Sequence, residues 1–80
     1  MTRPTRRFAV LGFATTHDAL SAESLLKDMG VPVVPIPAPR SLGSLCGIAL
    51  RLEREDEERA GDLLSAAGVA VTARADIDDV

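Results

Sequence analysis

The sequence predicts an α+β fold of the ferredoxin-like type, a four-stranded antiparallel sheet with two helices on one face. Segments with strand-like and helix-like periodicity follow one another in the order β-α-β-β-α-β. With right-handed crossovers, this order makes the first and third strands central neighbours and places the second and fourth at the edges. The expected second strand is rich in proline, which favours an edge because proline donates no hydrogen bond to a neighbouring strand.

The first half of the chain contains one strand, one helix and the proline-rich strand. The apolar run at residues 7–14 is expected to form the first strand. Thr15 or Thr16 can cap the helix that follows, in which apolar residues recur at helical spacing. Gly30 is expected to end this helix in a left-handed conformation, and residues 31–38 to form the second strand.

The second half repeats this order after a loop at residues 39–45. Residues 46–52 are expected to form the third strand, residues 53–67 a charged helix and residues 69–72 a short last strand. The helix should bury a stripe made of Ala60, Leu63, Leu64 and Ala67.

The organisation of the chain is expected to be one domain spanning residues 1–80. The end of the first helix, from Leu25, matches the end of the second, from Leu63, at an offset of 38 residues (63 − 25), which supports two related halves. We expect a core at about residues 7–73 and a frayed acidic tail at residues 75–80.

Composition excludes several classes of function. A net charge of −3 and the absence of Tyr and Trp give neither attraction to phosphate backbones nor a base-stacking surface, so we expect no nucleic-acid partner. No apolar run approaches the roughly 20 residues that span a bilayer, so we expect no membrane partner. A single cysteine fits the reducing cytoplasm, and one cysteine with one histidine cannot close a metal site, so none is predicted.

Cys46 is the residue that we expect to carry the function. The predicted topology starts the third strand beside the end of the first, so Cys46 should lie near Thr15, Thr16 and His17 at the N-terminus of the first helix. The partial positive charge of that helix end lowers the pKa of a nearby thiol and favours the reactive thiolate.

Residues predicted to lie near Cys46 could support such a thiolate. Arg40 and a protonated His17 are the available cations, and the Ser44 hydroxyl could hydrogen-bond a thiolate or a bound anion. Gly47 leaves room for an approaching partner. Each residue also has a structural interpretation, since a lone cysteine is often a small buried apolar side chain and threonine is a common helix cap.

Two spaced elements carry a family resemblance. They are Thr16-His17-Asp18-Ala19-Leu20 with Ala22-Glu23, and Pro39-Arg40 with Ser44-Leu45-Cys46-Gly47. Over about residues 7–73, the sequence resembles a family of small bacterial and archaeal proteins described as selenium/sulfur carrier protein-like. Ala14 and Gly43 depart from its pattern, which commonly has serine at both positions, so an extended set of hydroxyl donors is not expected here.

The resemblance implies that Cys46 holds a persulfide or selenopersulfide and passes the atom on. It implies a carrier or accessory protein rather than an independent enzyme, with no cofactor beyond the carried sulfur or selenium. The partner would be a cysteine desulfurase or another selenium/sulfur-transfer protein, and a homo-oligomer is compatible with the sequence.

Two alternative functions stay open at this point. The first is a small-ligand or anion-binding regulatory module in which Cys46 is structural. The second, weaker alternative is a thiol enzyme such as a reductase, whose disulfide cycle would have to be intermolecular because the chain has no second cysteine.

Overall fold

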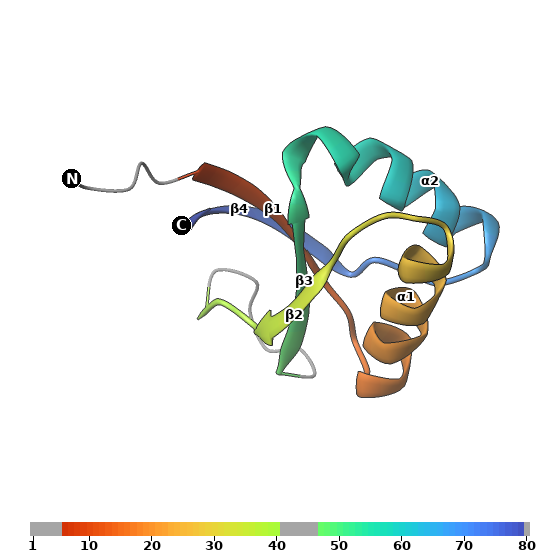
Figure 1. Ribbon diagram of the computed structural model, residues 1–80. Coiled ribbons are helices and arrows are strands. Elements are labelled where there is room, and N and C mark those ends of the chain that lie inside the picture. The colour runs from red at the N-terminus through yellow and green to blue at the C-terminus, as the bar shows by residue number, and fades with distance from the viewer. Residues whose placement is uncertain (1–5, 41–46, 80) are drawn as a thin grey trace.

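The computed structural model describes residues 6–40 and 47–79, and it has the α+β ferredoxin-like fold (Figure 1). In chain order, its elements are β1 (Arg6–Gly12), α1 (Thr16–Asp28), β2 (Val34–Pro37), β3 (Ile48–Glu53), the short 3-10 helix η2 (Arg54–Asp56), α2 (Glu57–Ala66) and β4 (Ala73–Asp79). The strand order is β2-β3-β1-β4, and every pair of neighbours is antiparallel. The predicted fold class and the central position of β1 and β3 are therefore confirmed.

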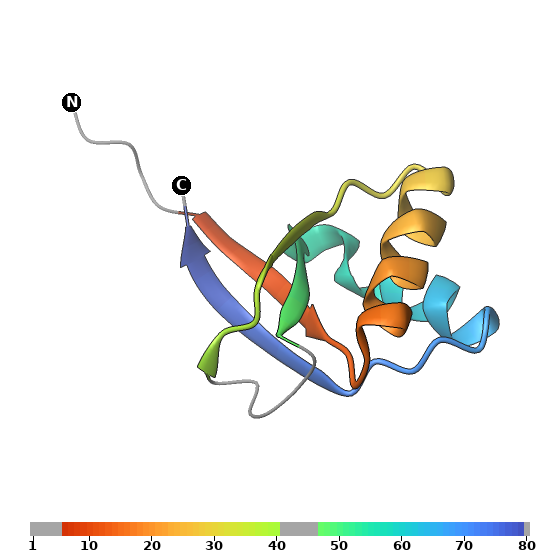
Figure 2. The same cartoon turned by 90° about the horizontal axis from the view of Figure 1, so that it is seen from below.

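Both helices cover the same side of the sheet (Figure 2). Alternate residues of the central strands point toward them, among them Leu11 of β1 and Leu50 of β3, which are fully buried. Leu26 of α1 and Leu64 of α2 pack onto these residues, and Phe13 joins them just after β1. Burying each leucine stabilises the fold by roughly 1.5–3 kcal/mol, so this aliphatic layer accounts for the docking of both helices.

The opposite face of the sheet carries a second, thinner apolar layer. Val10 and Ala49 are fully buried at its centre, although no helix of the described residues lies over them. The Arg51 guanidinium lies on this face 4.5 Å from the centroid of the Phe8 ring, a cation–π distance. The partly buried residues around this layer are Ile36, Ala38, Ala73, Ala75 and Ile77.

The ends of α1 follow local rules that the sequence predicts. Thr15 is the N-cap residue, and its hydroxyl accepts a hydrogen bond from the Asp18 N–H at 3.1 Å. The helix ends at Asp28, and Gly30 follows with φ +78°, as expected. Arg59 of α2 donates to the Met29 carbonyl at 2.8 Å, which satisfies a group that the helix end leaves without an intrahelical partner.

The last strand differs from the prediction. The strand expected at residues 69–72 and the frayed tail expected at residues 75–80 are wrong, because β4 spans Ala73–Asp79 and pairs along its whole length with β1. Val69 and Val71 do not belong to a strand. Their partly buried side chains pack against the core cluster that also holds both helices. The small and apolar residues of β4 alternate with charged ones, as in a strand with one face toward water.

Other element bounds shift by a few residues. β1 ends at Gly12, β2 covers only Val34–Pro37 of the expected residues 31–38, and β3 begins at Ile48. The expected second helix divides into η2 and α2, and Ala67 of its predicted stripe is exposed because it is the C-cap residue. Of the other three stripe residues, Ala60 and Leu64 are buried and Leu63 is half-buried.

Candidate functional site

The N-terminus of α1 presents polar residues to solvent. Thr15, Thr16 and His17 are all exposed, and α1 is long enough for its aligned peptide dipoles to give this end partial positive charge. The Thr15 hydroxyl already accepts the Asp18 N–H, so the cap interpretation of this threonine is confirmed. The first N–H groups of the helix make no intrahelical bonds by construction and can face an incoming anionic group.

The start of β3 lies at the same end of the sheet as this helix terminus. Gly12, the last residue of β1, is opposite Ala49, so Gly47 and Ile48 extend past the point where β1 ends. The chain of β1 turns into α1 at this same point (Figures 1 and 2). The topological part of the prediction, that β3 begins beside the end of β1, is therefore confirmed.

Gly47 has a backbone conformation that favours glycine. Its φ is +92°, in the left-handed region, and a Cβ built on it would meet no atom of the described residues within 4 Å. Its carbonyl accepts a hydrogen bond from the Ala38 N–H at 3.0 Å, which extends the β2–β3 pairing by one step beyond Pro37 and Ile48. Glycine is therefore favoured at this position by its backbone conformation, and not by a lack of room for a Cβ atom among the described residues.

Two of the predicted site residues, Cys46 and Ser44, lie outside the described residues. Arg40, which is described, is exposed at the end of the segment that follows β2. The structure thus places Thr15, Thr16, His17 and Gly47 at one end of the sheet, and the approach of Cys46 to them stays a prediction.

A shallow hollow of about 570 Å³ runs along the exposed side of α1, starting at His17. Leu20, which is 53% exposed, contributes an apolar side chain to its lining, and Asp28 contributes a charged one. The remaining lining residues are Ser21, Ser24 and Leu25.

The described residues contain no group of three or more His, Cys, Asp or Glu side chains that could hold a metal ion. None of the helices in this part of the chain has the length and apolar character needed to cross a membrane.

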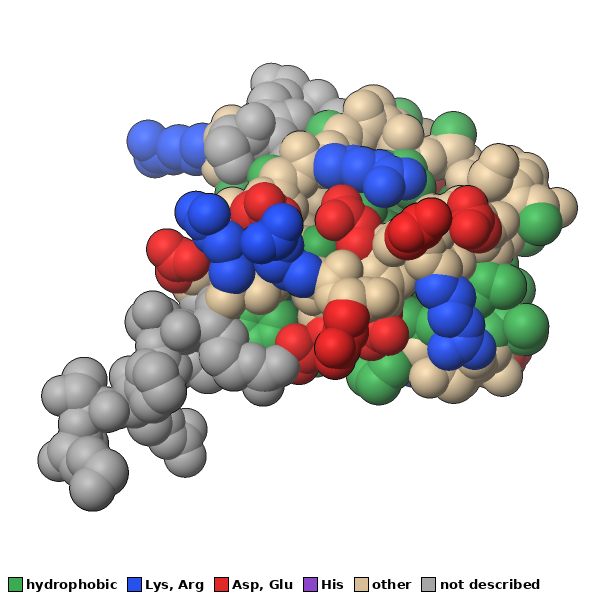
Figure 3. Space-filling model, turned by 90° about the horizontal axis from the view of Figure 1, so that it is seen from above, with side chains coloured by type: hydrophobic (Ala, Val, Ile, Leu, Met, Phe, Trp, Pro, Cys, Tyr) green, Lys and Arg blue, Asp and Glu red, His purple; other side chains and the backbone are tan. Residues whose placement is uncertain are grey.

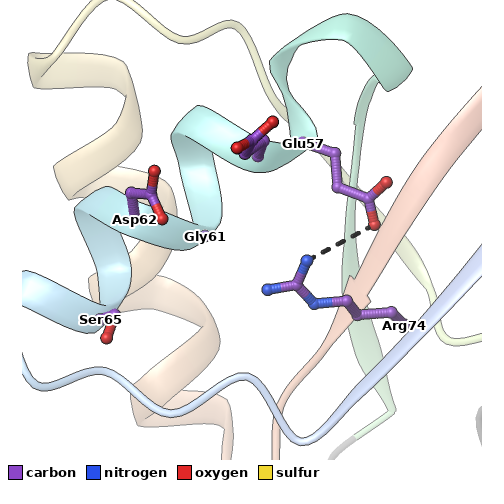
Figure 4. A pocket seen from close by; sticks show the side chains of 6 residues that line it. Glu57, Gly61, Asp62, Ser65 and Arg74 are labelled. Carbon is purple, nitrogen blue, oxygen red and sulfur yellow. Dashed lines mark ion pairs between the residues drawn. The ribbon is translucent and has the colours of Figure 1, made fainter.

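A second polar region lies between α2 and β4, and the sequence analysis missed it. Arg74 points from β4 toward Glu57, with 3.8 Å between the guanidinium and the carboxylate (Figure 4). The guanidinium lies against Gly61, where a Cβ would be only 2.7 Å from the Arg74 Nη2 atom. The alternation of charged and small residues from residue 73 onward is the signal that could have revealed this strand and its charges.

Comparison with known proteins gives one family match. The model of the family described as "Putative Se/S carrier protein-like" matches residues 8–74, which is most of the chain and includes Cys46. No curated protein and no solved structure matches the chain.

Proposed function

The chain belongs to the Se/S carrier protein-like family, and from this membership we propose that it carries sulfur or selenium on Cys46. The observation that carries the proposal is the family match over a segment that contains a single cysteine. A carried chalcogen atom needs a nucleophilic thiolate, and this chain has only one thiol to supply it.

The proposed transfer exchanges one sulfur–sulfur bond for another. The Cys46 thiolate attacks the outer sulfur of a persulfide on a donor protein, which forms a bond between the Cys46 Sγ atom and that sulfur. The bond between the outer sulfur and the donor cysteine breaks, and its electron pair leaves with the donor as a thiolate. A thiolate on the acceptor later attacks the same sulfur and releases Cys46, so neither step needs an added oxidant or reductant.

Features of the described residues support this chemistry. The start of β3, two residues after Cys46 in sequence, is at the same end of the sheet as the α1 N-terminus, whose partial positive charge favours a thiolate or persulfide anion. Gly47, the residue after Cys46, has no side chain, and no atom in the described part of the chain lies within 4 Å of a Cβ built there, which favours the approach of a partner's cysteine. His17 is exposed at the same helix end.

We propose a cysteine desulfurase or another selenium/sulfur-transfer protein as the donor. Such an enzyme forms a persulfide on its own cysteine. The thiolate of that cysteine is the leaving group that the exchange requires. A reducing compartment such as the cytoplasm suits this role, because it keeps a lone thiol from forming stable disulfides.

The test is to incubate the reduced protein with a cysteine desulfurase and cysteine and to weigh it intact. We expect a mass increase of one sulfur atom on the wild type, located on the peptide that contains Cys46, and its loss on treatment with a reducing thiol. Cys46→Ser is the matched control and should gain nothing. No added sulfur on the wild type, or equal addition to Cys46→Ser, would count against the proposal.

A further inference from the structure

The two edges of the sheet differ in their capacity to accept another strand. At the β2 edge, Ala38 donates to the Gly47 carbonyl, so the even-numbered residues of this segment point their N–H groups toward β3. Pro35 and Pro37 then occupy the outward positions, where they offer no N–H group. The β2 edge is therefore blocked to a regular ladder over Val34–Pro37.

The β4 edge has no such block. It is seven residues long, it contains no proline, and within the described residues its only strand neighbour is β1. Every second residue of β4 therefore points its backbone N–H and C=O groups away from β1, where they can pair with another strand. Edge strands of this length in natural proteins are usually blunted or paired.

The charges of β4 select one register for pairing with a second copy of itself. In an antiparallel pair centred on Ala75, Arg74 lies opposite the partner's Asp76, and Asp76 lies opposite the partner's Arg74. Ala75 then faces the partner's Ala75, and Ala73 faces the partner's Ile77. All charges that meet directly in this register are of opposite sign.

Other registers also place the helix-covered faces of the two sheets on the same side. The neighbouring ones bring like charges into contact. Centring the pair on Arg74 places Arg74 against its own copy. Centring it on Asp76 gives two Arg74–Asp78 pairs of opposite charge, but it also places Asp76 against its own copy, a like-charge pair that the Ala75 register avoids. Centring it on Ile77 places Asp76 opposite Asp78. Like charges directly opposite one another destabilise a strand pair, so the Ala75 register is the favoured one.

Within one copy, the two side chains already belong to ion pairs that reach toward this edge. The Arg74–Glu57 and Asp76–Arg54 pairs are both 3.8 Å long, and Arg74 and Asp76 keep 50% and 38% of their side-chain surface exposed. The face seen in Figure 3 carries such basic and acidic side chains next to one another. A hollow of about 200 Å³ lined by Glu57, Arg74, Ala75 and Asp76 leaves room here for the partner's side chains.

From these observations we propose that two copies of this chain pair through β4, antiparallel, about a two-fold axis at Ala75. Each copy contributes Arg74 and Asp76, so the row of charges across the dimer alternates in sign from Arg54 through Asp76 and the partner's Arg74 to the partner's Glu57. The two sheets become one continuous sheet with all the helices on one side. The interface is argued from β4 and its ion pairs alone, so the dimer does not depend on the proposed function.

The test uses the symmetry of the charge pairs. We expect the wild type to associate to a dimer in light scattering and native mass spectrometry as the concentration rises from micromolar to millimolar. Arg74→Asp and Asp76→Arg should each weaken this association about 10- to 100-fold, because both symmetric pairs become repulsive. A one-to-one mixture of the two variants should restore the dimer, since every pair in the mixed dimer again joins opposite charges.

A matched control exchanges the charges of an ion pair that joins β1 to β4. Arg7 and Asp78 form a cross-strand ion pair of 3.3 Å within one chain, and Asp78 faces the partner's Thr72 in the proposed register. The double variant Arg7→Asp with Asp78→Arg should therefore dimerise like the wild type. A wild type that stays monomeric at every concentration, or single variants whose mixture stays monomeric while each is folded by circular dichroism, would overturn the proposal.

Discussion

Replacing Gly47 by alanine tests whether the backbone at the start of β3 matters for function as well as for stability. The φ of +92° disfavours any residue with a Cβ atom, and the substituted residue gains strain of about 1–2 kcal/mol. No atom of residues 6–40 or 47–79 lies within 4 Å of the new Cβ, so the expected loss comes from the backbone conformation. Gly68→Ala is the matched control, because Gly68 has φ +77° and equally open surroundings after α2.

Both variants should therefore lose similar stability. A domain of this size has a total stability of about 4–12 kcal/mol, so both should stay folded at room temperature. Each kcal/mol lost should lower the melting temperature by about 4–8 °C. Thermal unfolding followed by circular dichroism measures this loss, and equal shifts in the two variants show that the backbone strain is matched.

Function should separate the two variants. The substituted residue at position 47 relieves its strain by rotating toward negative φ, which reorients the peptide that joins it to Cys46 and weakens the 3.0 Å bond between the Gly47 carbonyl and the Ala38 N–H. Sulfur loading by a desulfurase should therefore fall several-fold in Gly47→Ala and stay at the wild-type rate in Gly68→Ala. Equal loading rates in the two variants, or a Gly47→Ala protein as stable as the wild type, would refute this reasoning.

Three further substitutions test the contacts that hold the elements in place, each followed by urea unfolding. Thr15→Ala should lower the free energy of unfolding by about 1 kcal/mol because a first-turn N–H loses its acceptor, and Thr15→Ser should restore it; an alanine variant as stable as the wild type would contradict the cap. Gly61→Ala should raise the free energy of unfolding by up to about 1 kcal/mol, because alanine favours a helix more than glycine does. The new Cβ lies 2.7 Å from the flexible end of Arg74, so the full gain should appear in an Arg74→Ala background. A loss of stability in that background would show that the new Cβ clashes with another group. Arg59→Met should lower the free energy of unfolding by about 0.5–1.5 kcal/mol through the lost bond to the Met29 carbonyl, and no change would mean that water replaces the guanidinium.

The fold class could be predicted because each element carries its own local signal. Thr15 and Gly30 mark the ends of α1 through chemistry that depends only on nearby backbone, and the structure confirms both. The prolines of β2 identify an edge strand wherever the rest of the sheet lies. Right-handed connection rules then leave one arrangement for the four strands.

β4 was missed because its local signals point elsewhere. Val69 and Val71 have the β-branched side chains typical of a strand, but their contacts in the core satisfy them as a connecting segment. Most residues from Ala73 onward are small or acidic, which is typical of a solvated tail. Their alternation is a weak local signal for a strand, and the register with β1, which places Ile77 beside Phe8 and Ala75 beside Val10, explains why the segment forms one.

The candidate site could be predicted in part for the same reason. The polar N-terminus of α1 and its position beside the start of β3 follow from helix capping and topology. The left-handed conformation of Gly47 could not be predicted, because a glycine in sequence does not reveal which φ the chain requires of it. The charge complementarity of Arg74 and Asp76 likewise needs the strand and its alternation to be known first.

The central claim is that folding makes Cys46 a reactive thiolate at the α1 end of the sheet, and the rate of its alkylation against pH tests this most directly. Because Cys46 is the chain's one thiol, iodoacetamide reports on it alone, in folded and in urea-unfolded protein. We predict that the midpoint in the folded protein lies below the roughly 8.5 of a free thiol and that the unfolded protein returns to that value. A folded-state midpoint near or above 8.5, with slower alkylation than in urea, would contradict the account.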